Sequence, residues 1–273
     1  MTRNRTDFAD AVMRRIGEAE DARWEQKSVD PLTERLRASA ASAPALGHPA
    51  FADLPLGAAG TIDAAAMFLD LRQFTARSFW DPPMEMLRVN VAVITEIATA
   101  VQQHGGYILG FRGDGVFACF DGGSLGPQAA AGFAVGAGAW AIDAVRNALN
   151  GMLEVAGIKP VQIRVGMDYG RLDFVRVGSL AGSEVNVMGF AANFASKCEK
   201  VANSWEVVAG EGLASLLPAG DVTRHEKSPV TYTRGDQRRS YHFFDVDHFT
   251  YLSLVQGVSE QLGGRPLSAV GVT

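Results

Sequence analysis

The hydrophobic pattern alternates between strand-like and helix-like segments from about residue 62 onward. Apolar runs predict strands at 62–69, 107–112, 116–120, 161–167, 172–177, 207–208, 222–225, 231–233 and 241–246. Helical spacing predicts helices at 83–103, 127–152, 187–202 and 248–262. Hairpin turns are expected at 113–115 and 168–171, so hairpins connect the strands as often as helices do. This favours an α+β fold with a mostly antiparallel sheet flanked by helices, and the βαββαβ order agrees with a ferredoxin-like core.

The first 60 residues differ in composition from the rest. Residues 1–38 read as a charged helix interrupted by Pro31, and residues 39–60 are rich in Pro, Ala and Gly. We therefore expect an N-terminal helix and linker over 1–60 and one main domain over 61–273. The most apolar window, 129–145, is short and rich in Gly and Ala, which favours a buried helix over a membrane span.

Net charge, cysteine spacing and the charged N-terminal residues bear on which partners, metals and locations are expected. The net charge of −5 gives no indication of a nucleic-acid partner. The two cysteines, Cys119 and Cys198, belong to no metal-binding spacing, so zinc is not expected and buried free thiols are. Residues 1–30 carry charges throughout and contain no apolar targeting segment. The expected location is cytoplasmic, with no membrane partner.

Two aspartates carry the strongest chemical signal. Asp70 ends the apolar run 62–69, and Asp114 lies in the Gly-Asp-Gly turn between two strand-like runs. Taken alone, each is typical of a helix cap or a turn. If their strands lie side by side, the two carboxylates can hold a pair of cations, which suits chemistry on a polyphosphate.

The segments around these aspartates resemble the class III nucleotidyl cyclases. The resemblance is carried by 68–75 (FLDLRQFT), 111–120 (FRGDGVFACF) and 187–197 (VMGFAANFASK), in family order, and covers roughly 60–246. It implies the class III cyclase fold and a metal site of Asp70, Leu71 and Asp114 for two Mg²⁺ or Mn²⁺ ions. It also implies that the turn 71–75, with Phe74 and Thr75, presents backbone N–H groups to phosphates, although Gln73 stands where the family has Gly.

Further residues are assigned by the same resemblance. Asn193 and Lys197 lie four apart on one face of a predicted helix, where the family has an Asn and an Arg that act in catalysis. Lys keeps the positive charge but lacks the planar fork of Arg. Arg234 occupies the place of a family Lys, and the resemblance implies that it contacts the terminal phosphates. The family also implies a head-to-tail homodimer, in which Asp70 and Asp114 of one chain meet Asn193 and Lys197 of the other.

The residues that read the base depart from the purine patterns of the family. Gly110 and Asn186 stand where purine cyclases carry their base-contacting side chains, and Arg112 shares a strand face with Gly110. We hypothesise that Arg112 reaches over Gly110 to a pyrimidine carbonyl. This combination resembles the bacterial pyrimidine cyclases of Pycsar anti-phage defence. The resemblance implies UTP as the favoured substrate and a cyclic nucleotide product that signals to a separate effector protein. The alternatives are an adenylate or guanylate cyclase and a catalytically inactive nucleotide sensor.

Overall fold

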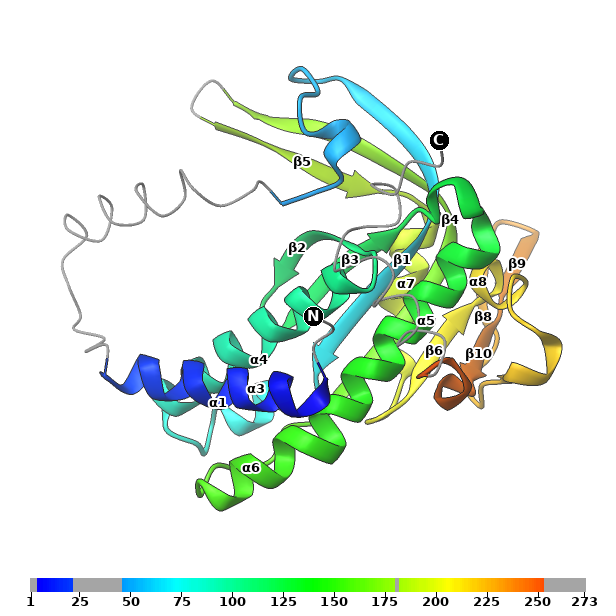
Figure 1. The fold of residues 1–273 in the computed structure, drawn as a ribbon. Coiled ribbons are helices and arrows are strands. Elements are labelled where there is room, and N and C mark those ends of the chain that lie inside the picture. Colours follow the sequence, from blue (N-terminus) through cyan, green and yellow to red (C-terminus); the bar gives the residue numbers. More distant parts are fainter. Residues whose placement is uncertain (1–3, 22–45, 180–181, 253–273) are drawn as a thin grey trace.

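The computed structural model describes residues 4–21, 46–179 and 182–252 of the chain. The strands are β1 (Ala59–Leu71), β2 (Tyr107–Arg112), β3 (Gly115–Phe120), β4 (Ile163–Ser179), β5 (Gly182–Met188), β6 (Val207–Gly210), β7 (Val222–Arg224), β8 (Val230–Arg234), β9 (Gln237–Tyr241) and β10 (Phe243–Val246). An eight-stranded sheet in the order β2-β3-β1-β4-β6-β10-β7, with β5 paired to β4, forms the centre, and β8–β9 is a separate hairpin (Figure 1). Within the described strands the β4–β6 pair is parallel and the others are antiparallel, which confirms the predicted fold class.

Helices cover both faces of this sheet. They are α1 (Arg5–Asp21), α3 (Phe74–Arg77), α4 (Pro83–Gln103), α5 (Pro127–Ala144), α6 (Asn150–Val155), α7 (Phe190–Val201) and α8 (Glu211–Ala214). The π-helical turn η3 (Val145–Leu149) joins α5 to α6, and the 3-10 turns are η1 (Pro49–Phe51), η2 (Gly123–Leu125), η4 (Ala219–Asp221) and η5 (His248–Tyr251). The helices α4 and α5 pack on one face and α7 on the other (Figure 1).

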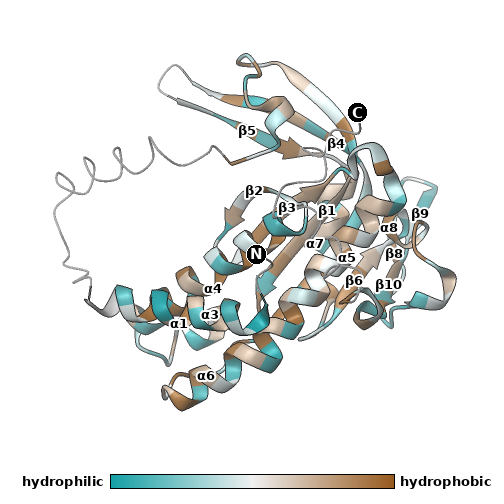
Figure 2. Ribbon diagram, in the orientation of Figure 1, coloured by the Kyte–Doolittle hydropathy of each residue, from teal (hydrophilic) through white to brown (hydrophobic). Residues whose placement is uncertain are grey.

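Strand β1 shows why the sheet is covered on both sides. Met67, Leu69 and Leu71 belong to the core beneath α4 and α5, whereas Ala64 and Ala66 belong to the core beneath α7. This is the two-residue period of a strand whose two faces are both buried. Figure 2 shows the same arrangement, with hydrophobic positions concentrated in the strands and in the helix faces that meet them.

A glycine in β4 sets how closely α7 lies on the sheet. A Cβ at Gly166 would lie 1.9 Å from the backbone nitrogen of Glu199 and 2.4 Å from the carbonyl oxygen of Ala195. Both distances are far below van der Waals contact, so any side chain at 166 would push α7 away. The close approach brings the end of α7 beside the end of β1.

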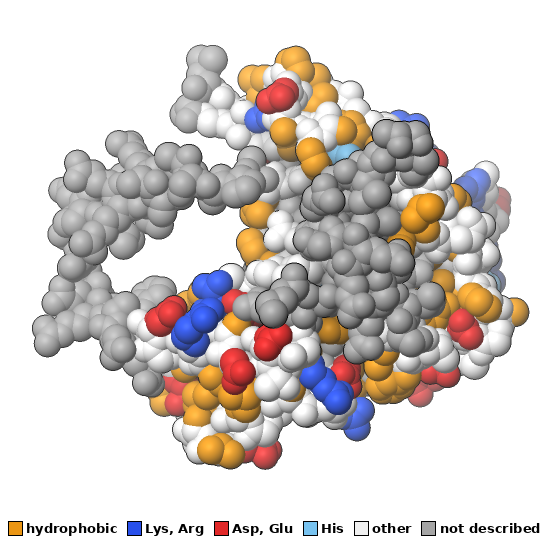
Figure 3. Space-filling view, in the orientation of Figure 1, with side chains coloured by type: hydrophobic (Ala, Val, Ile, Leu, Met, Phe, Trp, Pro, Cys, Tyr) orange, Lys and Arg blue, Asp and Glu red, His pale blue; other side chains and the backbone are white. Residues whose placement is uncertain are grey.

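The helix α1 packs against the helical layer of the main domain. Its apolar face lies in the same core as the sheet, through Phe8, Ala9, Val12 and Ile16. Arg5 pairs with Asp143 of α5 at 2.9 Å, and Arg15 pairs with the buried Glu96 of α4. On the molecular surface drawn in Figure 3, acidic, basic and hydrophobic side chains are interspersed. The division of the chain at residue 60 remains a prediction.

Two of the predicted turns and boundaries are wrong. The expected hairpin at 168–171 does not exist, because β4 runs through it as one strand paired with β1. The polar group that suggested a turn, Asp168, is buried and accepts hydrogen bonds from the N–H groups of Tyr169 (2.9 Å) and Leu213 (3.2 Å). The helix predicted from residue 187 begins at Phe190, because residues 182–188 pair with β4 as β5.

Other predicted elements are corrected in detail. The strand expected over 241–246 is two strands, of which β9 pairs with β8 and β10 joins the main sheet. Of the helix expected over 248–262, residues 248–251 form η5, and 253–262 lie outside the described residues, as do 22–38 of the N-terminal helix. The small-residue helix is confirmed as the buried α5. No helix in the described part of the chain combines the length and apolar character that crossing a bilayer requires.

Candidate active site

The two predicted metal ligands lie on adjacent strand ends. Asp70 of β1 stands opposite Gly115 of β3, and the N–H of Leu71 donates to the carbonyl oxygen of Asp114 at 3.2 Å. Asp114 lies in a two-residue turn whose first residue, Gly113, has φ of +67°. Burial, together with the negative charge of Asp70, raises the pKa of Asp114. The expected adjacency of the two strands is therefore present, and the two carboxylates lie close enough for the charge of Asp70 to act on Asp114.

An arginine that the sequence analysis did not single out completes this cluster. Arg164 of β4 donates to Asp70 Oδ2 from Nη2 at 2.9 Å and from Nε at 3.3 Å, and its Nη2 lies 2.5 Å from Glu199 Oε1. Burial raises the pKa of Glu199 to about 7, although Arg164 lowers it. The single guanidinium of Arg164 therefore lies among several carboxyl groups, so acidic groups outnumber basic ones in this cluster. In the sequence, the feature that could have pointed to Arg164 is its position as a lone Arg inside the apolar run 161–167.

The cluster offers oxygen ligands for a hard divalent cation. Asp70 Oδ2 is held by Arg164, whereas Oδ1 points toward the turn that carries Asp114: a Cβ at Gly115 would lie 3.4 Å from that oxygen. The same Cβ would be 2.9 Å from the Leu69 carbonyl oxygen, so only glycine fits there. Mg²⁺ and Mn²⁺ prefer carboxylate oxygens of this kind. The residues present therefore fit the expected ions.

In the turn after β1, the position that the family fills with glycine is Gln73, and its backbone has a conformation that favours glycine. Gln73 has φ of +62°, in the left-handed region. A non-glycine residue there costs about 1 kcal/mol, and such strain is retained where a turn has a specific task. The backbone then enters the short helix α3 at Phe74 and Thr75. Leu71 is itself buried in the core, so it offers the cluster only its backbone.

The three predicted base-reading residues line one cavity. Gly110 and Arg112 of β2 face Asn186 of β5 across a space of about 490 Å³. A Cβ at Gly110 would have no atom within 4 Å, so the space beside it is open. The Asn186 side-chain oxygen accepts the Val187 N–H at 2.9 Å, which leaves its amide hydrogens as the available donors. Arg112 and Asn186 therefore present hydrogen-bond donors to a ligand in this cavity, which Glu184 also lines.

The predicted catalytic pair lies elsewhere, in a larger cavity between α7 and the β8–β9 hairpin. Asn193 and Lys197 line this space of about 710 Å³, and Lys197 Nζ lies 5.7 Å from the centroid of the Tyr232 ring. Neither Asp70 nor Asp114 lines it. Arg234 does not line it either, since it lies at the tip of the hairpin, opposite Gln237.

A buried carboxylate supports the wall of the second cavity. The Tyr241 hydroxyl donates to Asp168 Oδ2 at 2.6 Å, and the Tyr241 ring packs on Phe194 with centroids 4.0 Å apart. Burial raises the pKa of Asp168 to about 6, in spite of the hydrogen bonds that it accepts. Asp168 thus ties the hairpin and α8 to the centre of β4.

The stability of the fold should depend on the protonation of Asp168. Its folded pKa lies above the unfolded value, so the protonated form stabilises the fold below about pH 4, and this contribution is lost as pH rises through 6. From pH 5 to pH 8 the loss is about 1.5 kcal/mol, or roughly 4 °C in Tm. Asp168→Asn should remove this part of the decline. Thermal unfolding at both pH values tests it, and equal declines in wild type and variant would contradict it.

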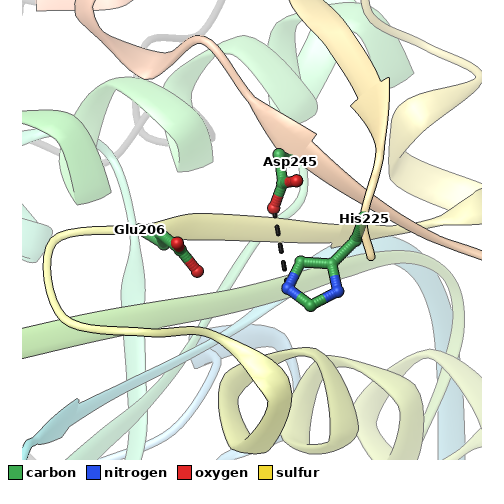
Figure 4. Close-up of side chains that lie close together, drawn as sticks. All are labelled: Glu206, His225 and Asp245. Carbon is green, nitrogen blue, oxygen red and sulfur yellow. Dashed lines mark ion pairs between the residues drawn. The ribbon is translucent and has the colours of Figure 1, made fainter. Parts of the chain in front are cut away.

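A second group of potential metal ligands lies away from this cluster. Glu206, His225 and Asp245 bring their polar atoms within 4.8 Å of one another (Figure 4). His225 Nδ1 accepts the Lys227 N–H at 3.1 Å, so in the neutral ring Nε2 carries the proton and directs it at Asp245, 3.7 Å away. A metal at Nε2 would require that backbone hydrogen bond to break.

Comparisons with known proteins agree with this architecture. Residues 58–245 match the family model described as the adenylate and guanylate cyclase catalytic domain. An adenylate cyclase from Anabaena cylindrica is 24% identical over 181 residues, which cover 66% of this chain and 34% of that protein. This chain therefore spans about a third of that relative's length.

Solved structures show the same fold. The adenylyl cyclase CyaB from P. aeruginosa superposes with a TM-score of 0.60 at 22% identity, over 69% of this chain and 95% of that one. The guanylyl cyclase Cya2 gives a TM-score of 0.56 at 24% identity, over 70% and 94%. At these identities the likeness establishes the fold of the domain, while the substrate has to be argued from this chain's own residues.

Proposed function

We propose that this chain, which belongs to the adenylate and guanylate cyclase family over residues 58–245, converts a pyrimidine nucleoside triphosphate into a 3′,5′-cyclic nucleotide and pyrophosphate. UTP is the favoured substrate. The observation that carries the cyclase activity is the convergence of Asp70 and Asp114 on adjacent strand ends. Family membership and an intact carboxylate pair both favour an active enzyme over an inactive nucleotide sensor.

The residues of the cluster have separate tasks in this proposal. Asp70, Asp114 and the backbone of Leu71 would hold two Mg²⁺ or Mn²⁺ ions. Such ions, when bound, lower the pKa of a ribose hydroxyl and neutralise phosphate charge. The turn that follows, with Phe74 and Thr75, would direct backbone N–H groups to phosphate oxygens.

The second group of residues would act on the sugar and on the transferring phosphate. Asn193 would orient the ribose, Lys197 would offset negative charge at the α-phosphate, and Arg234 would contact the leaving phosphates. The O3′–Pα bond forms as the Pα–O bond to pyrophosphate breaks, and the hydroxyl proton passes to water. Orientation and charge compensation supply the rate enhancement, and no protein nucleophile is needed.

The pyrimidine assignment depends on the cavity beside Gly110. The open space at Gly110 and the donors of Arg112 and Asn186 suit the carbonyl oxygens of uracil or cytosine. We place the product as a messenger in anti-phage defence, made in the cytoplasm and read by a separate effector protein. An adenylate or guanylate cyclase is the alternative, favoured by the names of the relatives.

Product analysis decides between these substrates. The purified chain is incubated with Mn²⁺ and each of UTP, CTP, ATP and GTP, and the cyclic products are identified. We expect pyrimidine products from the wild type. Arg112→Ala should lower the UTP:ATP turnover ratio about tenfold, the loss of one charge-assisted hydrogen bond. Arg171→Ala, an exposed arginine on β4, is the matched control and should leave the ratio unchanged.

Three outcomes of this product analysis would each contradict a different part of the proposal. An unchanged ratio in Arg112→Ala would exclude this residue from base recognition. Purine products from the wild type would overturn the pyrimidine assignment and leave cyclase activity standing. Absence of any cyclic product would favour the nucleotide sensor.

We also propose that two copies of the chain assemble head to tail to complete each site. Within one chain, Asn193 and Lys197 line a cavity that contains neither Asp70 nor Asp114. A reaction that needs both groups is therefore best served by a two-fold dimer with two shared sites.

A further inference from the structure

The cavity between α7 and the β8–β9 hairpin has the character of an anion site. Three cations line it: Lys197 and Lys200 of α7, and Arg239 of β9. None of its lining residues is acidic, although the whole chain has a net charge of −5. Local positive charge in a cavity attracts anionic ligands even where the whole protein is negative.

The register of the hairpin places Arg239, rather than Arg234, in this cavity. Arg239 stands directly opposite Tyr232, whose ring lies under Lys197 Nζ. Cross-strand partners share one face of a hairpin, so Arg239 and Lys197 approach the same space from two elements. Arg238, which directly precedes Arg239 on β9, does not line the cavity.

We propose that Arg239 supplies the guanidinium that position 197 lacks, and binds phosphate oxygens of the nucleotide together with Lys197 and Lys200. Lys197 stands where the family resemblance expects an arginine. An ammonium group gives charge at one point, whereas a guanidinium gives two parallel N–H donors to a phosphate. This assignment rests on the proposed cyclase function and adds a phosphate-binding residue that the family motifs do not contain.

The charge on Arg239 is available for this task. Across residues 4–21, 46–179 and 182–252, no carboxylate forms an ion pair with Arg239, Lys197 or Lys200. The side chains of Phe190, Phe194, Tyr232 and Tyr241 line the same cavity and add no negative charge to it.

Two measurements on the full chain test the assignment. The first is calorimetric titration with inorganic tripolyphosphate, which needs no turnover. Arg239→Ala should weaken binding roughly 10- to 100-fold, the loss of a bidentate charge-assisted contact, and Arg239→Lys should fall between. Arg238→Ala removes the same charge from the neighbouring position and should bind as the wild type does.

The second measurement separates this assignment from the cyclase proposal. With the preferred nucleotide and Mn²⁺, Arg239→Ala should lower kcat/KM by a similar factor, with Arg239→Lys recovering part of it. Equal behaviour of Arg239→Ala and Arg238→Ala in both assays would overturn the assignment while leaving the cyclase activity untouched. If the wild type makes no cyclic product, the cyclase proposal fails, and the titration alone still decides whether Arg239 binds phosphate.

Discussion

Replacing Asp70 or Asp114 with asparagine is expected to lower kcat/KM at least about 1000-fold for the nucleotide that the wild type prefers. The amide keeps the size of the carboxylate but loses the charge that a divalent cation requires. A factor of 1000 corresponds to about 4 kcal/mol of transition-state stabilisation, which is within the range attributed to metal ions. Asp63→Asn, at an exposed position of the same strand, is the control and should stay within about twofold.

A stability measurement gives this prediction a second readout. Mn²⁺ should raise the Tm of the wild type and leave that of Asp114→Asn unchanged, because a bound ion stabilises only the form that binds it. Without metal, Asp114→Asn should be at least as stable as the wild type, since burial and the charge of Asp70 already disfavour the ionised carboxylate. Activity above a tenth of wild type, with the Mn²⁺ shift intact, would refute the metal assignment.

Local signals in the sequence were sufficient for the strands that carry the aspartates. The apolar run before Asp70 and the glycines around Asp114 each specify their own element, and the two strands are neighbours along the sheet. The cavity shared by Gly110, Arg112 and Asn186 also agrees with the grouping expected from the motifs.

Long-range packing decided what the sequence could not show. Asp168 was misread as a turn residue because its partners, Leu213 and Tyr241, lie more than 40 residues away along the chain. Arg164 and Glu199 were missed for the same reason, since their meeting at Asp70 depends on the register of β4 and on the close approach of α7 over Gly166. Periodicity reports the face of a residue and says little about its partner across the fold.

Mixing two inactive variants should restore activity if the sites are shared between chains. Asp70→Ala and Asn193→Ala damage different halves of a site. In an equal mixture half of the dimers are mixed, and each mixed dimer has one intact site of two, so about a quarter of wild-type activity should return.

The control for this experiment pairs two defects in the same half. Asp70→Ala mixed with Asp114→Ala leaves every site damaged and should restore nothing. The same experiment shows to which half of the shared site Arg239 belongs. Arg239→Ala should be rescued by Asp70→Ala and not by Asn193→Ala, because Arg239 and Asn193 line one cavity. If Asp70→Ala and Asn193→Ala stay inactive together although subunit exchange is demonstrated with tagged chains, each site must lie within a single chain. The separation of the two residue groups would then have to be closed by movement within that chain rather than by a second copy.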